Sequence, residues 1–405
     1  MILNKFKSTN LPWWIYLSIF LVIYCSKDSC FFGVNQDNNI KLVGYIISFF
    51  ISMFLIYKVG VARALSSFKP YIELLSLLSL LTLAVNLDFS IKYFYEIMLF
   101  LTCSAIVLLL SFENFKLVYS DIIFFISLFS IIIHFLNIFT PGLLSVFPIY
   151  RNETGYPFRF CFLGVATEPD FGLYRNWGLF REPGVFIFYL CIGLIFELFN
   201  KNINFKRVIC YIVSIVTTLS TAGFIVTGLI FCVFFLFSKK ATQKQRLIFT
   251  FFLLLGIGLS VSIGIASNLI DSAFGKLYYE NDSTTSRIGS IMTNFNMWCE
   301  SIKSILFGNG FSFVEQNFSH YVDATMGGWN NTNTAFKMLA VHGLFYTSIV
   351  YYMLIKFCRK EYKSISLFIF IIIILLQSNE DLIVSFHTYL FAYYALGKKT
   401  KSLYI

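Results

Sequence analysis

Residues 120–139 read SDIIFFISLFSIIIHFLNIF, an apolar run with a single acidic residue, Asp121. A helix needs about 20 mostly apolar residues to cross the hydrocarbon core of a bilayer. The whole chain is similarly apolar: of its 405 residues, 58% are hydrophobic and 13% are charged, and its mean hydropathy is +0.75. A soluble protein of this length cannot bury so much apolar surface. The composition excludes a cytosolic enzyme, a secreted disulfide-rich protein and a disordered chain, and it predicts that most of the protein is surrounded by lipid.

Apolar runs of this kind recur along the chain and predict an all-α polytopic membrane protein of about twelve transmembrane helices, forming one integral membrane domain over residues 1–405. Lys5 and Lys7 precede the first run, and no small-residue cleavage site follows it, so we expect a retained span and not a signal peptide. The expected spans are 11–26, 39–57, 71–87, 91–112, 120–139, 182–199, 207–221, 222–238, 247–266, 334–355, 364–377 and 382–397.

The basic residues predict the orientation of these spans. The net charge is +10, but the lysines lie in short tracts between apolar runs and not in a basic domain, which argues against nucleic acid as a partner. Basic residues are enriched in cytoplasmic connections. With both termini in the cytoplasm, 20 of the 31 basic residues fall on that side, in the tails and the even-numbered connections.

The two long connections, 140–181 and 267–333, then lie on the outer face, where basic residues should be scarce. They nevertheless hold five of the nine arginines: Arg151, Arg159, Arg175, Arg181 and Arg287. The planar fork of arginine binds phosphate groups well, so this excess indicates an anionic ligand. The alternative is salt bridging with the acidic residues nearby, Glu153, Glu168, Asp170 and Glu182.

The densest polar segment is Arg175 to Phe186, RNWGLFREPGVF. Pro183 suits the first turn of a helix, and Glu182 just before it favours the positive end of the helix dipole. We therefore expect Arg181 and Glu182 at the outer end of the sixth span, where a helix N-terminus beside an arginine makes an anion site. An ordinary helix entry with a surface ion pair would fit the same spacing.

The second long connection contains three features. Residues 288–306 predict a short amphipathic helix, and Gly308, Asn309 and Gly310 predict a turn that folds the chain back toward the next span. The polar run 327–334 then leads into the tenth span. Its amides and Trp329 would suit a sugar-like ligand, although a plain polar loop would look the same.

These motifs resemble a known family. The pattern Arg175-x-x-Gly178-x-Phe180-x-Glu182-Pro-Gly184 at the start of a span is similar to the signature of O-antigen and capsular polysaccharide polymerases of the Wzy type. In the second connection, Arg287, an amphipathic helix, a Gly-x-Gly turn and a polar run before a span resemble the broader O-antigen ligase and polymerase superfamily.

The resemblance implies a GT-C-like glycosyltransferase of the bacterial inner membrane that needs no metal or other cofactor. Its substrate would be an undecaprenyl-pyrophosphate-linked glycan, and its partners would be membrane lipid and a chain-length regulator protein. The growing glycan would be transferred to the non-reducing end of an incoming lipid-linked repeat. The residues expected to bind pyrophosphate or glycan are Arg159, Arg175, Arg181, Arg287, Trp329 and Asn331.

The general base is less well defined by the motifs. Ligases of the superfamily carry a histidine in the polar run, where this chain has asparagines. His320 has a suitable unperturbed pKa range, while a loop histidine is also often plain surface. Glu182 would either act as the base or orient an arginine. We also expect Glu380 and Asp381 at the turn between the last two spans, with His387 on the same face as Glu380 two helical turns later.

Three other expectations follow from the residues. Glu168 with Asp170 and Glu280 with Asp282 have acid-x-acid spacing but no accompanying ligands, so no metal site is expected. Cys161 and Cys299 lie in the long connections and would be able to pair, although nothing requires it. An O-antigen ligase and a lipid-linked oligosaccharide flippase or transporter remain the alternative functions.

Overall fold

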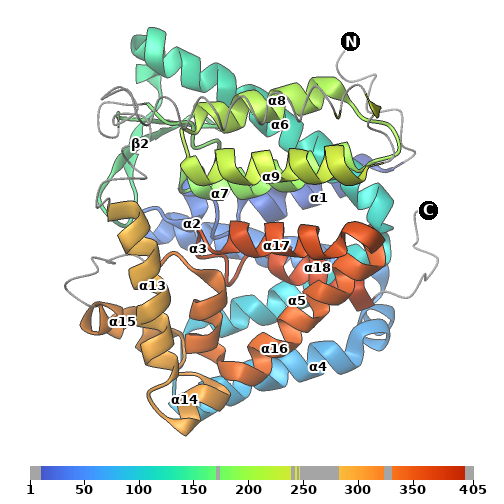
Figure 1. The fold of residues 1–405 in the computed structure, drawn as a ribbon. Helices are drawn as coiled ribbons and strands as arrows, with labels where there is room; N and C mark the ends of the chain where they lie inside the picture. Colours follow the sequence, from blue (N-terminus) through green and yellow to red (C-terminus); the bar gives the residue numbers. More distant parts are fainter. Residues whose placement is uncertain are drawn as a thin grey trace, which may run out of the picture. The chain divides into compact units, whose positions relative to one another are not determined.

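The computed structural model describes residues 11–169, 174–238, 242–243, 246, 282–322 and 331–396. These residues are mostly helical (Figure 1). The helices are, in chain order, α1 (Trp13–Tyr24), α2 (Cys30–Gly33), α3 (Asn38–Val59), α4 (Val61–Asn86), α5 (Ile91–Leu109), α6 (Phe112–Phe139), α7 (Pro183–Leu198), α8 (Phe205–Thr217), α9 (Thr221–Phe237), α13 (Asp282–Trp298), α14 (Ile302–Phe307), α15 (Phe311–Tyr321), α16 (Thr334–Tyr362), α17 (Ser366–Gln377) and α18 (Phe386–Leu396). Short 3₁₀ helices cover Pro141–Val146 and Lys363–Ile365.

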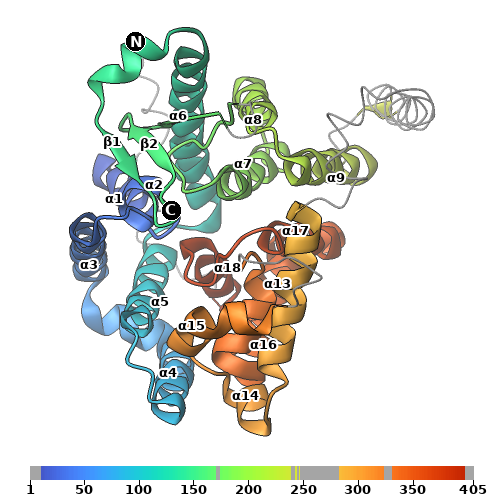
Figure 2. The ribbon, with the colours of Figure 1, turned by 90° about the vertical axis from the view of Figure 1, so that its left-hand side faces the viewer.

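The described part of the chain packs as two compact units. Unit 1 draws on Met1–Ser76, Ile91–Phe224 and Val384–Ile405, and unit 2 on Leu77–Ser90 and Ile225–Ile383. In unit 1, α6, α7 and α8 pack together, as do α3 with α5 and α5 with α18 (Figure 2). In unit 2, α16 packs against α13, α14 and α17.

Four helical stretches are long and apolar enough to cross a membrane, so the chain has the character of a helical membrane protein. They are Asn38–Val59, Ile91–Leu109, Phe112–Phe139 and Thr334–Gln377, the last of which contains α16 and α17. Every other expected span within the described ranges also contains a helix, and 247–266 lies outside those ranges. The count of twelve spans and the orientation of the termini and long connections stay predictions.

Two boundaries differ from those expected. The helix predicted from residue 120 begins at Phe112, because Ser111 caps it by accepting a hydrogen bond from the Asn114 amide. The expected connection around Lys116 is therefore helical, and its ammonium is held by Glu113 at 2.7 Å. The helix predicted over 288–306 is instead two helices, α13 and α14, because Ser301 caps a new helix start.

The all-helical prediction also needs a correction. Residues 149–167 form a three-stranded antiparallel sheet of β1 (Ile149–Arg151), β2 (Pro157–Phe160) and β3 (Val165–Thr167), in the order β1-β2-β3. Phe31 of α2 stacks on Phe160 of β2 with the ring centroids 4.1 Å apart. Aromatic burial against α2 thus stabilises a small sheet whose strands are too short for a clear alternating pattern.

Unit 1 is tied together by an ion cluster that joins three helices. Arg207 of α8 donates to Glu197 of α7 at 2.7 Å and also bonds to Asp121 of α6. Glu197 is 1% exposed, so its charge depends on this arginine. We call Arg207, Asp121 and Glu197 the Arg207 cluster.

Helix α16 is broken at Gly343, whose φ of 77° and ψ of −174° leave the helical region. The break exposes carbonyl groups that the helix no longer satisfies. The predicted turn at residues 308–310 meets this break: the Asn309 amide donates to the Ala340 carbonyl at 2.8 Å, and the Gly310 amide to the Val341 carbonyl at 3.0 Å. A Cβ at Gly343 would lie 2.4 Å from the Leu306 carbonyl oxygen, so only glycine fits.

Candidate functional site

The arginine-rich segment of unit 1 ends in the helix start predicted from the sequence. Helix α7 begins at Pro183, and Glu182 is its N-cap residue. The Glu182 side chain makes no capping hydrogen bond to the first turn of α7. The remainder of α7 is buried, whereas Glu182 is exposed and Arg181 half-buried. The N-terminus of α7, with an exposed N-cap residue, therefore lies next to a cationic side chain.

The residues before Arg181 hold this segment in place. Arg175 donates from Nε to the Thr218 carbonyl at 3.0 Å, and the buried Asn176 donates to the hydroxyls of Ser130 and Thr217 at 3.2 and 3.0 Å. Trp177 stacks on the Tyr156 ring at 5.5 Å. The segment is thereby fixed to α6, the sheet connection and the α8–α9 connection, all within unit 1.

Gly178 is needed for the close packing of this segment. Its φ is 61°, and a Cβ there would lie 3.0 Å from the ring of Phe186 in α7. Both the left-handed conformation and the close approach disfavour a larger side chain at this position. The glycine of the sequence motif thus has a structural role.

A buried carboxylate that the sequence did not single out lies beside Arg181. The Arg181 amide donates to the Asp28 carbonyl at 2.9 Å, within a short antiparallel bridge between residues 28–30 and 179–181. The Asp28 carboxylate accepts hydrogen bonds from Tyr189 at 2.7 Å and from Ser385 at 2.8 Å. Burial raises the pKa of the Asp28 carboxyl, while the Arg181 charge and these hydrogen bonds lower it. Arg181 therefore acts on Asp28, a carboxylate that was not among the four acids considered from the sequence.

Arg159, the remaining predicted arginine of unit 1, contacts backbone. It lies in β2 and donates to the Phe147 carbonyl at 2.7 Å. Arg151 similarly donates to the Gly155 carbonyl, and Glu153 pairs with Lys41 at 2.8 Å. These contacts stabilise the sheet region, so Arg159 has a clear structural use whatever else it binds.

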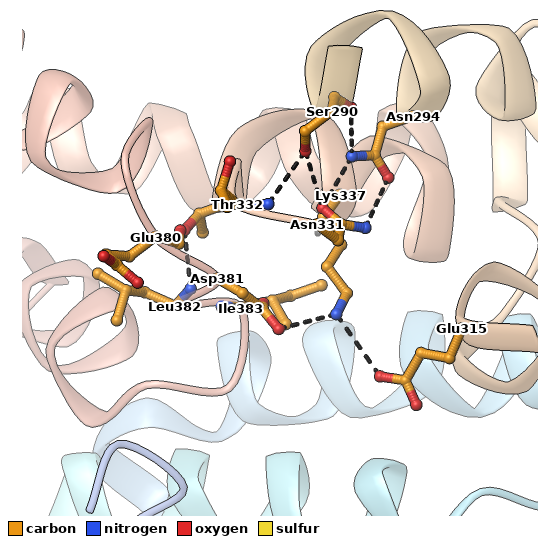
Figure 3. A network of polar contacts seen from close by, with 11 residues as sticks. Ser290, Asn294, Glu315, Asn331, Thr332, Lys337, Glu380, Asp381, Leu382 and Ile383 are labelled. Carbon is orange, nitrogen blue, oxygen red and sulfur yellow. Dashed lines mark hydrogen bonds and ion pairs between the residues drawn. The ribbon is translucent and has the colours of Figure 1, made fainter. Parts of the chain in front are cut away.

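Unit 2 contains a polar network around Asn331 (Figure 3). The Asn331 amide group exchanges hydrogen bonds with Asn294 at 2.9 and 3.1 Å, and its oxygen also lies 3.3 Å from the Ser290 hydroxyl. Ser290 and Asn294 lie on α13, and Asn331 precedes α16. The start of α16 is capped by Asn333, which accepts from the Phe336 amide at 3.0 Å. Residues 331–334 of the polar run predicted before the tenth span are thus an ordered part of unit 2, and residues 327–330 lie outside the described residues.

A buried ion cluster lies one turn into α16. The Lys337 ammonium is 2.8 Å from the Asp381 carboxylate and 3.5 Å from that of Glu315 on α15 (Figure 3). The Lys337 and Asp381 side chains are 4% and 9% exposed, whereas that of Glu315 is 37% exposed. We call these three residues the Lys337 cluster. Thr334 adds to it by donating to the Glu380 carbonyl and accepting from the Leu382 amide.

The other predicted residues of unit 2 are more scattered. His320 is exposed in the last turn of α15, and Arg287 is half-buried near the start of α13. Trp329 lies outside the described residues.

The expectation that Glu380 and His387 share a helix face is wrong, because α18 begins only at Phe386 and Glu380 precedes it. His387 instead packs against the Tyr189 ring at 4.4 Å in unit 1.

The predicted site residues therefore belong to both units. Unit 1 holds Arg159, Arg175, Arg181 and Glu182, and unit 2 holds Arg287, His320 and Asn331. The sequence did not predict Asp28, Asn176 or the Lys337 cluster as site residues, although Asp28 lies two residues after a predicted span and Asp381 was expected at the turn between the last two spans. A buried charged residue at the end of a membrane span often has a functional role.

The structure also bears on metals and cysteines. Within the described residues, no group of three or more His, Cys, Asp or Glu side chains gathers closely enough to hold a metal ion. All nine cysteines are free thiols. Cys161 is buried, which raises its pKa to about 11 and keeps its thiol protonated. The pair considered from the sequence, Cys161 and Cys299, is thus not a disulfide in this structure.

Comparison with known proteins gives no relative: no family model matches the chain, and neither a curated protein nor a solved structure does. The fold by itself defines the class, a mostly helical protein with apolar, membrane-embedded helices.

Proposed function

We propose that this protein is a polysaccharide polymerase that joins undecaprenyl-pyrophosphate-linked repeat units on the periplasmic face of a bacterial inner membrane. The observation that carries the proposal is the uncapped N-terminus of α7 next to Arg181, at the start of an apolar helix. A helix N-terminus and an arginine together suit a phosphate group at a membrane surface. The motif resemblance of residues 175–184 points to the same reaction.

In this reaction an acceptor sugar hydroxyl attacks the anomeric carbon of the donor glycan. The bond from that carbon to the lipid pyrophosphate breaks, and the pyrophosphate leaves with the bonding electrons. Arg181 and the α7 amides stabilise the charge that develops on it, as preorganised donors do in other enzymes. Arg175 acts as a positioning residue, since its Nε is bonded to the Thr218 carbonyl. Arg159 of unit 1 provides further positive charge for pyrophosphate or glycan, and the same role for Arg287 of unit 2 stays a prediction.

The proton of the acceptor hydroxyl needs a base. Glu182, on the same unit as Arg181, is exposed and suits this role chemically. His320, an exposed residue of unit 2, stays the other predicted base. The amide-rich network around Asn331 suits the hydroxyl groups of a glycan, with Trp329 as a stacking partner. A chain-length regulator would act on the assembled enzyme.

The test is complementation of a strain that lacks the protein. The strain should show a band with one repeat unit in place of a glycan ladder, and the wild-type chain should restore the ladder. Arg181→Ala should accumulate in the membrane but fail to restore long chains, and Arg181→Lys should rescue poorly because a point charge does not replace a planar fork. Arg151→Ala is the matched control, since Arg151 is an exposed arginine that donates to the Gly155 carbonyl, and it should restore the ladder.

A flippase is the second candidate, because the break of α16 at Gly343 is a discontinuous helix of the kind found in transporters. Lipid-linked repeats would then accumulate inside cells that lack the protein. Loss of even the one-repeat band, with capped lipid-linked glycan accumulating outside, would instead indicate a ligase. A normal ladder made by Arg181→Ala would remove the pyrophosphate role of this arginine.

A further inference from the structure

Unit 1 contains a cavity of about 520 Å³ that the proposed reaction does not use. Its volume lies within the range of about 300–1,000 Å³ of small-molecule and cofactor pockets. It lies along α3 and α5, which pack side by side (Figure 2), and the end of α1 closes one side. Its walls are mostly aliphatic and aromatic, and they include Leu42, Ile46, Phe49, Phe94 and Leu99.

The hydroxyl groups in the cavity wall are already bonded to the protein. Thr102 donates to the Met98 carbonyl at 2.7 Å and lies 2.6 Å from the Ser52 hydroxyl. Ser52 donates to the Ser48 carbonyl at 2.7 Å, and Ser48 to the Cys25 carbonyl at 3.3 Å. Since these donors have acceptors within the protein, an apolar ligand in the cavity would leave none of them unsatisfied.

The cavity is long, and its charge lies at one end. Lys92 lines it in the first turn of α5 and Thr102 in the same helix ten residues later, about 15 Å away at the rise of an α-helix. Lys27, which follows α1, lines the cavity at the end where Lys92 lies, because Tyr95 is hydrogen-bonded to the Lys27 backbone. Lys27 also acts electrostatically on Asp28. The result is an apolar cavity with two lysines in its wall at the same end.

The side of the cavity opens toward the membrane. Ile46 is 45% exposed and Leu42 52% exposed, although both are large apolar residues that line it. On a helix of a membrane protein, an exposed apolar face of this kind meets lipid chains. A ligand can therefore enter sideways from the bilayer.

We propose that this cavity is a binding site for an anionic phospholipid, with one acyl chain between α3 and α5 and the phosphate at Lys27 and Lys92. The two lysines complement a negative headgroup, and the positive N-terminal end of α5 adds to them. Phospholipid is the occupant because it surrounds the opening in great excess, and occupancy follows ligand concentration. The site is independent of the glycan reaction.

The test measures lipid binding to the purified full-length protein in detergent by native mass spectrometry, with phosphatidylglycerol and phosphatidylcholine as matched probes. Phosphatidylglycerol should bind about tenfold more tightly than phosphatidylcholine, and the Lys27→Ala/Lys92→Ala double variant should lose this preference. Lys41→Ala is the charge control, because Lys41 lies on α3 but is paired with Glu153, and it should bind like the wild type.

The binding of the acyl chain is tested by substitutions that narrow the cavity. Ile46→Trp, or Leu42→Trp if the first variant does not accumulate, should lower the binding of both phospholipids about tenfold. Leu17→Trp is the size control, since Leu17 is 44% exposed and lines a second apolar groove between α1 and α3. Equal binding of the two phospholipids to the wild type, or unchanged binding to both Trp variants, would overturn the proposal. So would a polyisoprenoid phosphate that binds where phosphatidylglycerol does not.

Discussion

The Arg207 cluster of unit 1 and the Lys337 cluster of unit 2 each combine one basic and two acidic side chains, yet they are built differently. Arg207 bonds to Glu197 and Asp121 through two separate nitrogens of its fork. Lys337 bonds to Asp381 at 2.8 Å, but its 3.5 Å separation from Glu315 is an ion pair without a short hydrogen bond. In the Arg207 cluster the more exposed carboxylate, Asp121, is 23% exposed and bonded to the arginine, whereas in the Lys337 cluster Glu315 is 37% exposed and lacks a short bond.

This difference distinguishes a charged side chain that mainly holds helices together from one that a ligand or a proton can reach. A buried carboxylate with a fixed partner mainly holds helices together, and breaking the pair leaves an uncompensated charge. A carboxylate at the edge of a cluster keeps acceptor capacity for a ligand or a proton. Of the two clusters, that of unit 2 has the more exposed carboxylate, Glu315, whose side chain is 37% exposed.

Removal of Arg207 should have the largest effect on stability. Arg207→Met leaves both Asp121 and Glu197 without their cation, which should destabilise the protein by about 3–5 kcal/mol. We expect strongly reduced accumulation in the membrane and a lower midpoint of thermal unfolding in detergent. Lys206→Ala, one residue away on an exposed position, is the control and should unfold like the wild type. Equal stability of the two variants would show that the cluster is not structural.

Removal of Lys337 should have an intermediate effect. Lys337→Met leaves one buried carboxylate, Asp381, without its short bond, and we expect a loss of about 1.5–3 kcal/mol in unfolding free energy. Glu315→Gln should cost less than about 1 kcal/mol, because Glu315 is partly exposed and its ion pair is long. Chemical unfolding of both variants checks the order. If Glu315→Gln were as unstable as Lys337→Met, Glu315 would be as important to stability as the buried partner Asp381. The contrast between the two clusters would then be wrong.

The smallest effect should come from Asp28, and it should depend on pH. Burial raises the pKa of this carboxyl above its unfolded value of about 3.9. The contribution of Asp28 to the free energy of unfolding is therefore complete below about pH 4. It is lost as the pH rises through the pKa of Asp28 in the folded protein. Asp28→Asn should remove this loss, so that its melting temperature falls less than that of the wild type between about pH 4 and pH 8.

The Arg181→Ala variant tests whether the charge of Arg181 affects the pKa of the Asp28 carboxyl. Without the arginine, the pKa of Asp28 should rise further, and the decline of stability with increasing pH should extend to higher pH. Melting curves of Arg181→Ala and of the Arg181→Ala/Asp28→Asn double variant across the same range test this. The same pH dependence for the wild type and Arg181→Ala would show that Arg181 does not act on Asp28.

The helical membrane class and the position of α7 were predictable from the amino-acid sequence. Apolar runs of sufficient length are a local property, and so is the helix start at Pro183, since proline fixes φ and lacks an amide donor. The turn at residues 308–310 was also expected from its glycines. What the turn does was not, because its amides satisfy carbonyls of α16 that become free only where Gly343 breaks the helix.

Composition by itself determined the class of this protein, and local residue patterns determined where its helices lie. Only the tertiary structure decided that Asp28 is the carboxylate beside Arg181, that Lys337 pairs with Asp381, and that a small sheet packs on α2. The physical reason is the distance along the chain over which each interaction acts. Hydrophobicity and backbone restriction act over a few consecutive residues, whereas the partner of a buried charge is set by which distant segments pack together, and only the folded chain brings those segments within hydrogen-bonding distance.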